Sequence, residues 1–387
     1  MDVIRTNQRR NGSSARMAKI ALGLLVWVAA GANSGVAAQT KLVVAADGSE
    51  QFKSVQEAIN AVPQTTSAAM PTIIQIRPGI YKELIYAQHE KRFVHLVGED
   101  AEKTVLTYDL HANIIGRDGK PIGTFRTPST VIDADDFTSE NITFENSAGP
   151  VGQALALRVD GDRVVFRNCR FLGWQDTVLL NRGRQYFEGC YIAGHVDFIF
   201  GAATAFFESC HIHCLQDGYI TAASTPDNEQ FGFVFSHCKI TGASAAVKTY
   251  LGRPWRPFAS STFLNTEMSE VVRPAGWHNW NQPDREKTAR YAEFNSSGPG
   301  ANPRARVSWS RQLTKATAAA ITLKRVLGGA DGWNPKAGRN GSVLKVNFAS
   351  RLVDFLFPSA LWFWRSFDRL NAHEPASLHT RLNPASR

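Results

Sequence analysis

Two aspartates occupy the same place in two consecutive copies of one short sequence unit. Asp176 lies in the segment VVFRNCRFLGWQDT, and Asp197 lies 21 residues later in QYFEGCYIAGHVDF. Short β-rich units repeated at about this period are typical of solenoids, in which each coil buries its apolar face against the next. Neighbouring coils of a parallel β-helix are about 5 Å apart, so the two carboxylates are expected side by side. A carboxylate pair of this kind is suited to acid–base or nucleophilic chemistry.

Side chains that could stabilise developing charge accompany this pair in the sequence. Gln153 precedes Asp176 by 23 residues and Gln175 precedes it directly, so both amides could donate to an oxyanion. Arg253, in TYLGRPWRPF, could lower the pKa of one aspartate, while the pKa of the other, facing a like charge, would be raised. Such a pair would divide into a nucleophile and an acid. The alternative is structural, because aspartates in solenoid turns also cap backbone amides.

The elements that must position these residues are further copies of the same unit. The copies share a Phe-x-x-Cys or Phe-x-x-Ser spacing, at Phe144/Ser147, Phe166/Cys169, Phe187/Cys190, Phe207/Cys210 and Phe235/Cys238. Every second residue of a strand faces the same side, so these pairs are expected to stack inside the solenoid. The sequence therefore predicts an all-β parallel β-helix with at least five coils.

An amphipathic segment precedes the coils. In FKSVQEAINAV, five apolar residues fall on one face of a helix, namely Phe52, Val55, Ala58, Ile59 and Val62. The open end of a solenoid needs a cover. We therefore expect an N-terminal capping helix here.

The first 38 residues differ from the rest of the chain. A basic start is followed by the apolar run 20–30 and by Val36-Ala37-Ala38 before Gln39. This order predicts a secretory signal peptide that is cleaved after Ala38, with Met17 as an alternative start and a membrane anchor as the alternative reading. We expect a secreted protein, extracellular or periplasmic, with no membrane span in the mature chain.

The last residues form a second distinct end. Residues 341–387 contain apolar and aromatic segments split by Pro358, for which we expect a separate, partly helical extension. Most of the net charge of +9 comes from residues 1–38 and 341–387, so the charge argues against nucleic acid as a partner. The catalytic domain is predicted to span residues 39–340, which is ample length for one solenoid.

Four motifs follow one another along the chain: GQALAL, GWQDT, HVDFIFG and LGRPW. In this order and at these distances they resemble the pectin methylesterase (pectinesterase) family, as do AGWHNW and GGADGWNP near the C-terminus. The resemblance runs from about Lys41 to Pro335. It implies a right-handed, pectin-lyase-like parallel β-helix that removes methyl esters from methylated homogalacturonan (pectin). We expect a monomer that works without a metal or an organic cofactor.

The resemblance assigns a role to each candidate catalytic residue. Asp197 is similar to the family's nucleophile, which attacks the methyl ester carbonyl of a galacturonate unit. Asp176 matches the general acid that protonates departing methanol and then serves as the base for water. Gln153 and Gln175 correspond to the amides of the oxyanion site, and Arg253 resembles the residue that keeps Asp197 ionised.

Three further residues correspond to substrate contacts of the family. Phe200 and Trp255 resemble aromatic walls of the sugar groove, although a core position is the alternative for Trp255. Thr124 lies where the family has a substrate-contacting Thr, but an extra residue follows it in this chain. The assignment of Thr124 therefore rests on a weaker match.

The cysteines admit two interpretations. Cys169, Cys190, Cys210 and Cys238 occupy equivalent places on successive coils, where neighbours could lie within bridging range. A Cys190–Cys210 disulfide is favoured because it resembles a bridge of bacterial family members, and a reduced stack in the core is the alternative. The segment 210–214, CHIHC, is dense in metal ligands, but strand alternation divides them between two faces, so no metal site is predicted.

Other solenoid functions remain as alternatives. A pectate lyase would need a calcium-binding carboxylate cluster, and a polygalacturonase would need carboxylates placed around a glycosidic bond. A non-catalytic pectin-binding solenoid would not need both aspartates. Hydrolysis of a different acyl ester is a further alternative. His195, beside Asp197, is expected to be structural, because no GxSxG-like nucleophile precedes it.

Overall fold

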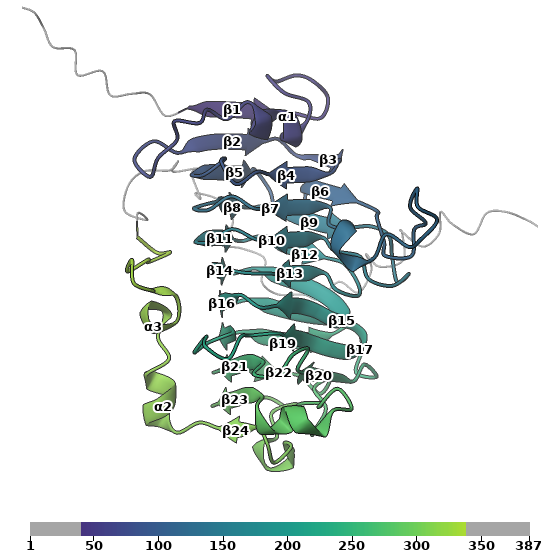
Figure 1. The fold of residues 1–387 in the computed structure, drawn as a ribbon, viewed down its shortest axis with the longest axis vertical. Helices are drawn as coiled ribbons and strands as arrows, with labels where there is room; N and C mark the ends of the chain where they lie inside the picture. The colour runs from purple at the N-terminus through teal and green to yellow at the C-terminus, as the bar shows by residue number, and fades with distance from the viewer. Residues whose placement is uncertain (1–39, 338–387) are drawn as a thin grey trace, which may run out of the picture. The chain divides into compact units, whose positions relative to one another are not determined.

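The computed structural model describes residues 40–337. The predicted signal peptide, residues 1–38, lies outside these residues, as does the predicted extension, residues 341–387. Successive turns of the chain stack on one another, and every pairing between the named strands of the described part is parallel (Figure 1). This arrangement confirms the predicted all-β parallel β-helix. No helix among residues 40–337 is long and apolar enough to cross a membrane.

One strand of each coil belongs to an 11-stranded sheet. Its members, in spatial order, are β1 (Lys41–Val44), β2 (Thr72–Ile76), β5 (Val94–Gly98), β8 (Thr138–Glu140), β11 (Val164–Arg167), β14 (Arg184–Glu188), β16 (Thr204–Glu208), β18 (Phe233–Ser236), β21 (Ser260–Leu264), β23 (Arg290–Phe294) and β24 (Arg311–Gln312). The order follows the sequence, as expected when each coil adds one strand to the sheet.

The other strands form a 13-stranded sheet with two rows. The first row contains β3 (Gly79–Lys82), β6 (Thr104–Tyr108), β9 (Thr143–Asn146), β12 (Arg170–Leu172), β19 (Lys239–Gly242) and β22 (Glu267–Met268). The second row contains β4 (Ile85–Ala87), β7 (Thr130–Ile132), β10 (Leu157–Val159), β13 (Val178–Leu180) and β20 (Thr249–Gly252). Two long strands, β15 (Tyr191–Gly201) and β17 (His211–Ala223), run through both rows and join them.

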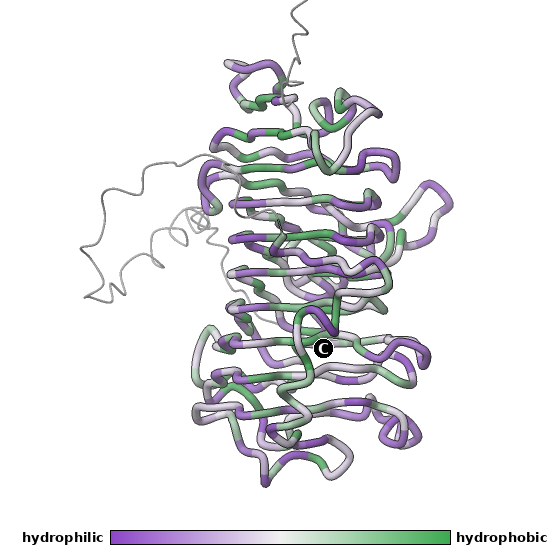
Figure 2. The backbone as a smooth tube through the Cα atoms, turned by 90° about the vertical axis from the view of Figure 1, so that its left-hand side faces the viewer, coloured by the Kyte–Doolittle hydropathy of each residue, from purple (hydrophilic) through white to green (hydrophobic). Residues whose placement is uncertain are grey.

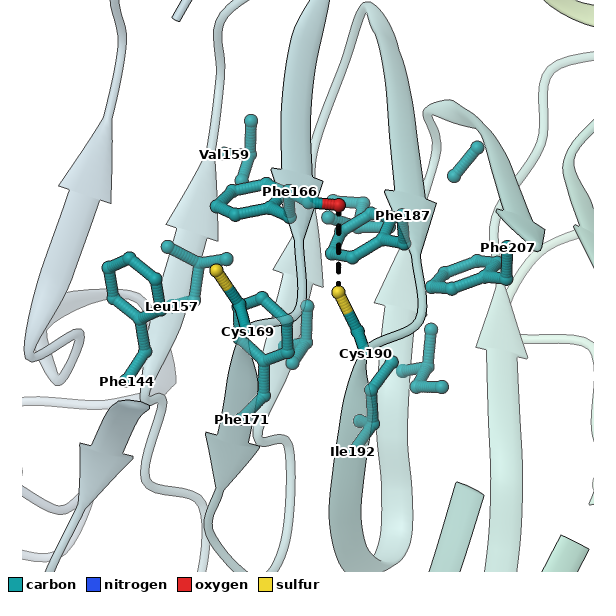
Figure 3. Packing of buried hydrophobic residues seen from close by; sticks show 14 of the residues in the cluster. Phe144, Leu157, Val159, Phe166, Cys169, Phe171, Phe187, Cys190, Ile192 and Phe207 are labelled. Carbon is teal, nitrogen blue, oxygen red and sulfur yellow. Dashed lines mark hydrogen bonds between the residues drawn. The ribbon is translucent and has the colours of Figure 1, made fainter. Parts of the chain in front are cut away.

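A ladder of phenylalanines fills the core. Phe166, Phe187, Phe207 and Phe235 are aligned in register, and their ring centroids are separated by 4.8, 4.6 and 4.4 Å in turn. Figure 3 shows the first three rings stacked face to face. Phe144 was wrongly aligned with them, because it lies in β9 and stacks on Phe171 at 5.5 Å.

The equivalent cysteines form a second ladder beside the rings. We call Cys169, Cys190, Cys210 and Cys238 the cysteine ladder; all four are buried, and all are free thiols. The predicted Cys190–Cys210 disulfide is therefore wrong for this structure. Equivalent residues of stacked coils point the same way, so each thiol lies beside its neighbour and bonds to backbone carbonyls instead, as the Cys190 thiol does to Phe166 O at 3.6 Å (Figure 3).

A short helix packs at the end of the solenoid that begins with β1 (Figure 1). Helix α1 (Val55–Asn60) buries Val55, Ala58 and Ile59, and Ser54 is its N-cap. Glu83 accepts hydrogen bonds from the Ser54 hydroxyl at 2.5 Å and from the Val55 N–H at 2.8 Å. The helix is shorter than the predicted amphipathic segment because Phe52 pairs with Val44 in a β-bridge.

The remaining elements lie outside the coils. Along the tube in Figure 2, hydrophobic segments run through the stacked strands, and the projecting loops are mostly hydrophilic. Helices α2 (Lys315–Ala319) and α3 (Leu323–Leu327) pack their apolar residues on the outer face of the 11-stranded sheet. Three 3-10 turns lie in loops, at η1 (Thr124–Arg126), η2 (Pro283–Lys287) and η3 (Pro303–Ala305).

Candidate active site

The two aspartates lie on adjacent coils, as their spacing predicts. Asp176 precedes β13 and Asp197 lies within β15, and the Asp176 N–H donates to Val196 O at 3.0 Å. Their exposed fractions are only 9% and 5%. Two buried aspartates thus lie on neighbouring strands of the sheet.

The backbone is irregular where it carries this pair. Asp176 and Asp197 both have positive φ angles, 62° and 52°, a conformation that costs free energy for residues other than glycine. The pairing of β15 with β17 shifts register on both sides of Val196. Gly194 allows the close approach, because a Cβ there would lie 2.3 Å from the Cβ of Phe198. Strain of this kind is typical of functional sites.

Arg253 holds Asp197 through both of its oxygens. The guanidinium donates from Nε to Oδ1 at 2.8 Å and from Nη2 to Oδ2 at 2.6 Å. Arg253 follows Gly252, at the end of β20, where a Cβ would lie 2.0 Å from the hydroxyl oxygen of Thr221. The absence of a side chain at position 252 lets β20 approach β17 closely and directs Arg253 towards the aspartates.

Burial and nearby charges affect the pKa values of the two carboxyl groups differently. Burial, followed by the nearby charge of Asp197, raises the pKa of Asp176 to about 8, and Arg253 opposes this shift. Burial also raises the pKa of Asp197 above its ordinary value, but the hydrogen bonds and charge of Arg253 act against it. Because only Asp197 is bonded to the guanidinium, it is the group that ionises first, and Asp176 keeps its proton at neutral pH.

The two glutamines stand side by side on neighbouring coils. Gln153 and Gln175 form a parallel β-bridge, and the Ala154 N–H donates to Gln175 O at 3.1 Å. Both side chains are half-buried. Within residues 40–337, neither side-chain amide has a hydrogen-bond partner, so both remain available to a ligand.

Aromatic side chains cover the outer face of the sheet beside the aspartates. Phe200 packs in an apolar cluster with Leu155, Leu179 and Ala222, and Trp255 and Trp280 lie against this cluster. The rings of Phe200 and Trp255 meet edge to face, with their centroids 5.8 Å apart. Trp255 is half-buried, so it belongs to the surface next to the site and not to the solenoid interior.

Residues missed by the sequence analysis complete this surface. Phe125, which is 52% exposed, stacks on Trp255 at 6.4 Å and places its neighbour Thr124 at the same edge. Tyr219 and Trp280 lie against Arg253, 3.9 and 3.7 Å from the guanidinium carbon to each ring centroid. No spacing signal marks these three aromatic residues, and only AGWHNW, as a family-like motif, pointed to Trp280.

The three histidines considered in the sequence analysis have local contacts. His195 packs on Trp174 with ring centroids 5.7 Å apart, and burial lowers its pKa. His211 and His213 both bond to the Thr241 hydroxyl, at 2.7 and 2.8 Å. In the described part of the chain, no group of three or more His, Cys, Asp or Glu side chains is arranged to hold a metal ion.

The arrangement of an aspartate pair, an arginine and two free amides on a parallel β-helix occurs within residues 41–330, and this range matches the pectinesterase family model. The chain belongs to the pectinesterase family. It is an enzyme of the carboxylic ester hydrolase class, as the sequence predicted. GQALAL, GWQDT, HVDFIFG, LGRPW and AGWHNW all lie inside the matched range.

Individual pectinesterases resemble the chain over most of their own length. It is 45% identical to "Pectinesterase 31" of Arabidopsis thaliana over 283 residues, which cover 71% of this chain and 89% of that relative. The carrot pectin methylesterase structure matches with a TM-score of 0.70 at 32% identity, covering 77% of this chain and 96% of that one. A pectin methylesterase solved in complex with a hexasaccharide matches with a TM-score of 0.66 at 29% identity, covering 77% and 99%.

Proposed function

We propose that this pectinesterase hydrolyses the methyl esters of galacturonate units in pectin and releases methanol and de-esterified pectate. The observation that carries the proposal is the asymmetric aspartate pair, in which Asp197 is bonded to Arg253 through both oxygens and the pKa of Asp176 is about 8. A bonded carboxylate beside a protonated carboxyl group supplies a nucleophile and an acid at neutral pH. The hexasaccharide complex of a structural neighbour supports an oligosaccharide substrate.

In the proposed mechanism, one oxygen of the Asp197 carboxylate attacks the ester carbonyl carbon. Gln153 and Gln175 donate hydrogen bonds to the oxyanion that forms there. When the C–OCH₃ bond breaks, Asp176 gives its proton to the leaving oxygen, and methanol departs from an acyl-enzyme anhydride. Asp176, now ionised, removes a proton from water as the water oxygen attacks the galacturonate carbonyl carbon, and the bond from that carbon to the Asp197 oxygen breaks. Asp197 is again ionised, Asp176 is again protonated, and the galacturonic acid group releases its proton to solvent.

Arg253 has two tasks in this scheme. It keeps Asp197 ionised, and its two hydrogen bonds fix the plane of the carboxylate before the attack. Phe200 and Trp255 would contact the sugar rings beside the ester, and Thr124 would contact the substrate from the same edge. We further propose that the mature protein acts as a secreted monomer, since residues 1–38 have the pattern of a signal peptide and the proposed substrate is a polymer.

The test is methanol release from highly methylated pectin by the purified protein and by Asp197→Ala. We expect methanol from the wild type and none above background from the variant. A matched control is Asp160→Asn, because Asp160 is also buried, at 7% exposed, and paired with an arginine, Arg158, at 2.6 Å. Full activity in Asp197→Ala, or no methanol from a folded wild type, would refute the proposal.

A further inference from the structure

The guanidinium of Arg253 is enclosed by two aromatic rings. Its central carbon lies 3.9 Å from the ring centroid of Tyr219 and 3.7 Å from that of Trp280. A planar guanidinium has two faces, and two ring centres this close to one carbon must occupy one face each. The side chain of Arg253 is therefore held from both sides while its edge bonds to Asp197. We call Tyr219 and Trp280 the arginine clamp.

The backbone that presents Trp280 is strained. Trp280 and Asn281 both have positive φ angles, 62° and 54°, which side chains of this size rarely adopt. Two side chains hold this turn: His278 Nδ1 accepts from the Trp280 N–H at 3.0 Å, and Asn279 Oδ1 accepts from the Asn281 N–H at 2.9 Å. Two consecutive residues in this conformation indicate that the position of the indole is specified.

The same turn also touches the other half of the clamp. The ring of His278 lies 5.5 Å from that of Tyr219, edge to face. Tyr219 in turn stacks on Tyr250 at 5.4 Å, so both rings of the clamp are themselves supported. The two faces of Arg253 are thus bounded by one packed group of side chains from β17, β20 and the turn at residues 278–281.

We propose that Tyr219 and Trp280 are positioning residues of the esterase reaction, which fix the plane of Arg253 so that it can bond to both oxygens of Asp197. The inference rests on the proposed function, in which Asp197 is the nucleophile. An arginine has several rotatable bonds, and a bidentate contact requires its fork to lie in the plane of the carboxylate. Aromatic rings on both faces restrict rotation out of that plane and attract the cation.

The clamp also limits what the two rings can do for a substrate. The ring faces that cover the guanidinium are closed to a sugar, and Arg285 lies 5.9 Å from the ring of Trp280 as well. A sugar-binding wall would act mainly on substrate affinity. A clamp acts on the nucleophile, so its loss should lower kcat and leave KM nearly unchanged.

The test compares leucine and phenylalanine at each clamp position in the full protein. For Trp280→Leu and Tyr219→Leu we expect kcat to fall about 10-fold, the effect of losing one desolvated cation–π contact, with KM within about twofold. The acid limb of the kcat profile should move to higher pH, because a less firmly held guanidinium lets the pKa of Asp197 rise. Trp280→Phe and Tyr219→Phe keep an aromatic face. These two variants should therefore retain most of the wild-type kcat and an acid limb close to that of the wild type.

The matched control is Trp333→Leu. Trp333 covers another guanidinium, that of Arg184, at 5.5 Å, so this variant removes a contact of the same kind outside the proposed site. It should leave kcat and the acid limb unchanged. If the clamp variants raise KM and keep kcat, or if leucine and phenylalanine give equal losses, the positioning role is wrong.

A second measurement separates this inference from the proposed function. Titration of the Asp197 carboxyl carbon by ¹³C NMR, in the wild type and in Trp280→Leu, should show a higher pKa in the variant whether or not pectin is hydrolysed. A wild type that releases no methanol would overturn the proposed function. The titration would still show whether Tyr219 and Trp280 position Arg253 against Asp197. If Trp280→Leu does not fold, Tyr219→Leu decides, and an unchanged Asp197 pKa in that variant would overturn the clamp.

Discussion

Replacing Asp176 by asparagine should abolish activity and stabilise the protein. Asp176 is buried beside Asp197, which raises its pKa from an ordinary value of 3.8 to about 8. Between these two pH values the folded state keeps the proton while the unfolded state has released it. The folded state then binds more protons than the unfolded state, so the free energy of unfolding of the wild type must fall as the pH rises.

The size of the effect follows from the two pKa values. Each pH unit between about 4 and 8 should lower the free energy of unfolding by about 1.4 kcal/mol. The stability that Asp176 contributes is present below pH 4 and is lost as the pH rises to about 8. Over the whole window the loss is on the order of 5 kcal/mol. Asparagine has nearly the same shape and no charge, so it avoids this loss.

The assay is urea denaturation of the wild type and of Asp176→Asn at pH 5, 6, 7 and 8. The difference in unfolding free energy should increasingly favour the variant as the pH rises, and it should level off above about pH 8. Asp331→Asn is a control of opposite sign. Its hydrogen bonds with Arg184 lower the pKa of Asp331, so the wild-type carboxylate should be favoured above pH 4.

A difference between wild type and Asp176→Asn that does not change with pH would refute the reasoning, because the variant would then not have removed a titrating group with a raised pKa. A constant difference in favour of the wild type over this range would mean that the Asp176 pKa is not raised, and the assignment of Asp176 as the acid would then be wrong.

Four further outcomes are expected. Arg253→Lys should lower kcat/KM about 100-fold, since an ammonium cannot bond to both oxygens of Asp197 in one plane; steady-state kinetics within twofold of wild type would contradict this. Phe187→Ala should lower the free energy of unfolding by about 3–5 kcal/mol, because the ring is fully buried between two other rings. A loss below about 1 kcal/mol, measured by urea denaturation, would contradict this and would show that the core collapses into the space left by the ring. Gly252→Ala should lower both stability and activity, since the new Cβ would lie 2.0 Å from the Thr221 hydroxyl oxygen; an unchanged melting temperature argues against the contact. Dithiothreitol should leave the melting temperature unchanged, because the cysteine ladder holds free thiols, and a fall would reveal a disulfide.

The spacing of the repeat predicted the aspartate pair because no insertion separates the two coils that carry it. A period of 21 residues places Asp176 and Asp197 in neighbouring coils, and the structure has them there. Arg253 lies 56 residues beyond Asp197, and the coils between them have loops of different lengths. The repeat period therefore does not predict where Arg253 lies relative to the aspartates. Only the LGRPW motif indicated this residue.

Two errors have the same origin in the geometry of a coil. Each coil contributes strands to three rows, and all rows have the same alternation of buried and exposed residues. Phe144 was therefore assigned to the row of Phe166, whereas it belongs to the row of Phe171. Equivalence by period also places Cys190 and Cys210 next to each other, but equivalent side chains of stacked coils point the same way, and the two thiols remain free.

The arginine clamp was missed because nothing in the local sequence marks Tyr219, and the AGWHNW motif, which contains Trp280, does not indicate a contact with Arg253. Tyr219 and Trp280 are separated by 61 residues, and each alone is an ordinary aromatic residue. Their contact with Arg253 depends on the close packing of β17, β20 and the strained turn at Trp280. Contacts of this kind exist only after the chain has folded, so no period or motif spacing predicts them.

The stacking of the coils has a consequence for how such a site could be moved. The spacing of Asp176 and Asp197 along the solenoid axis follows the distance between hydrogen-bonded strands, about 4.8 Å, so the backbone fixes it in the same way for every pair of neighbouring coils. Equivalent backbone positions recur in successive coils. A complete set of reactive groups could in principle be transplanted one or more coils along the axis, with its internal distances preserved by the backbone alone.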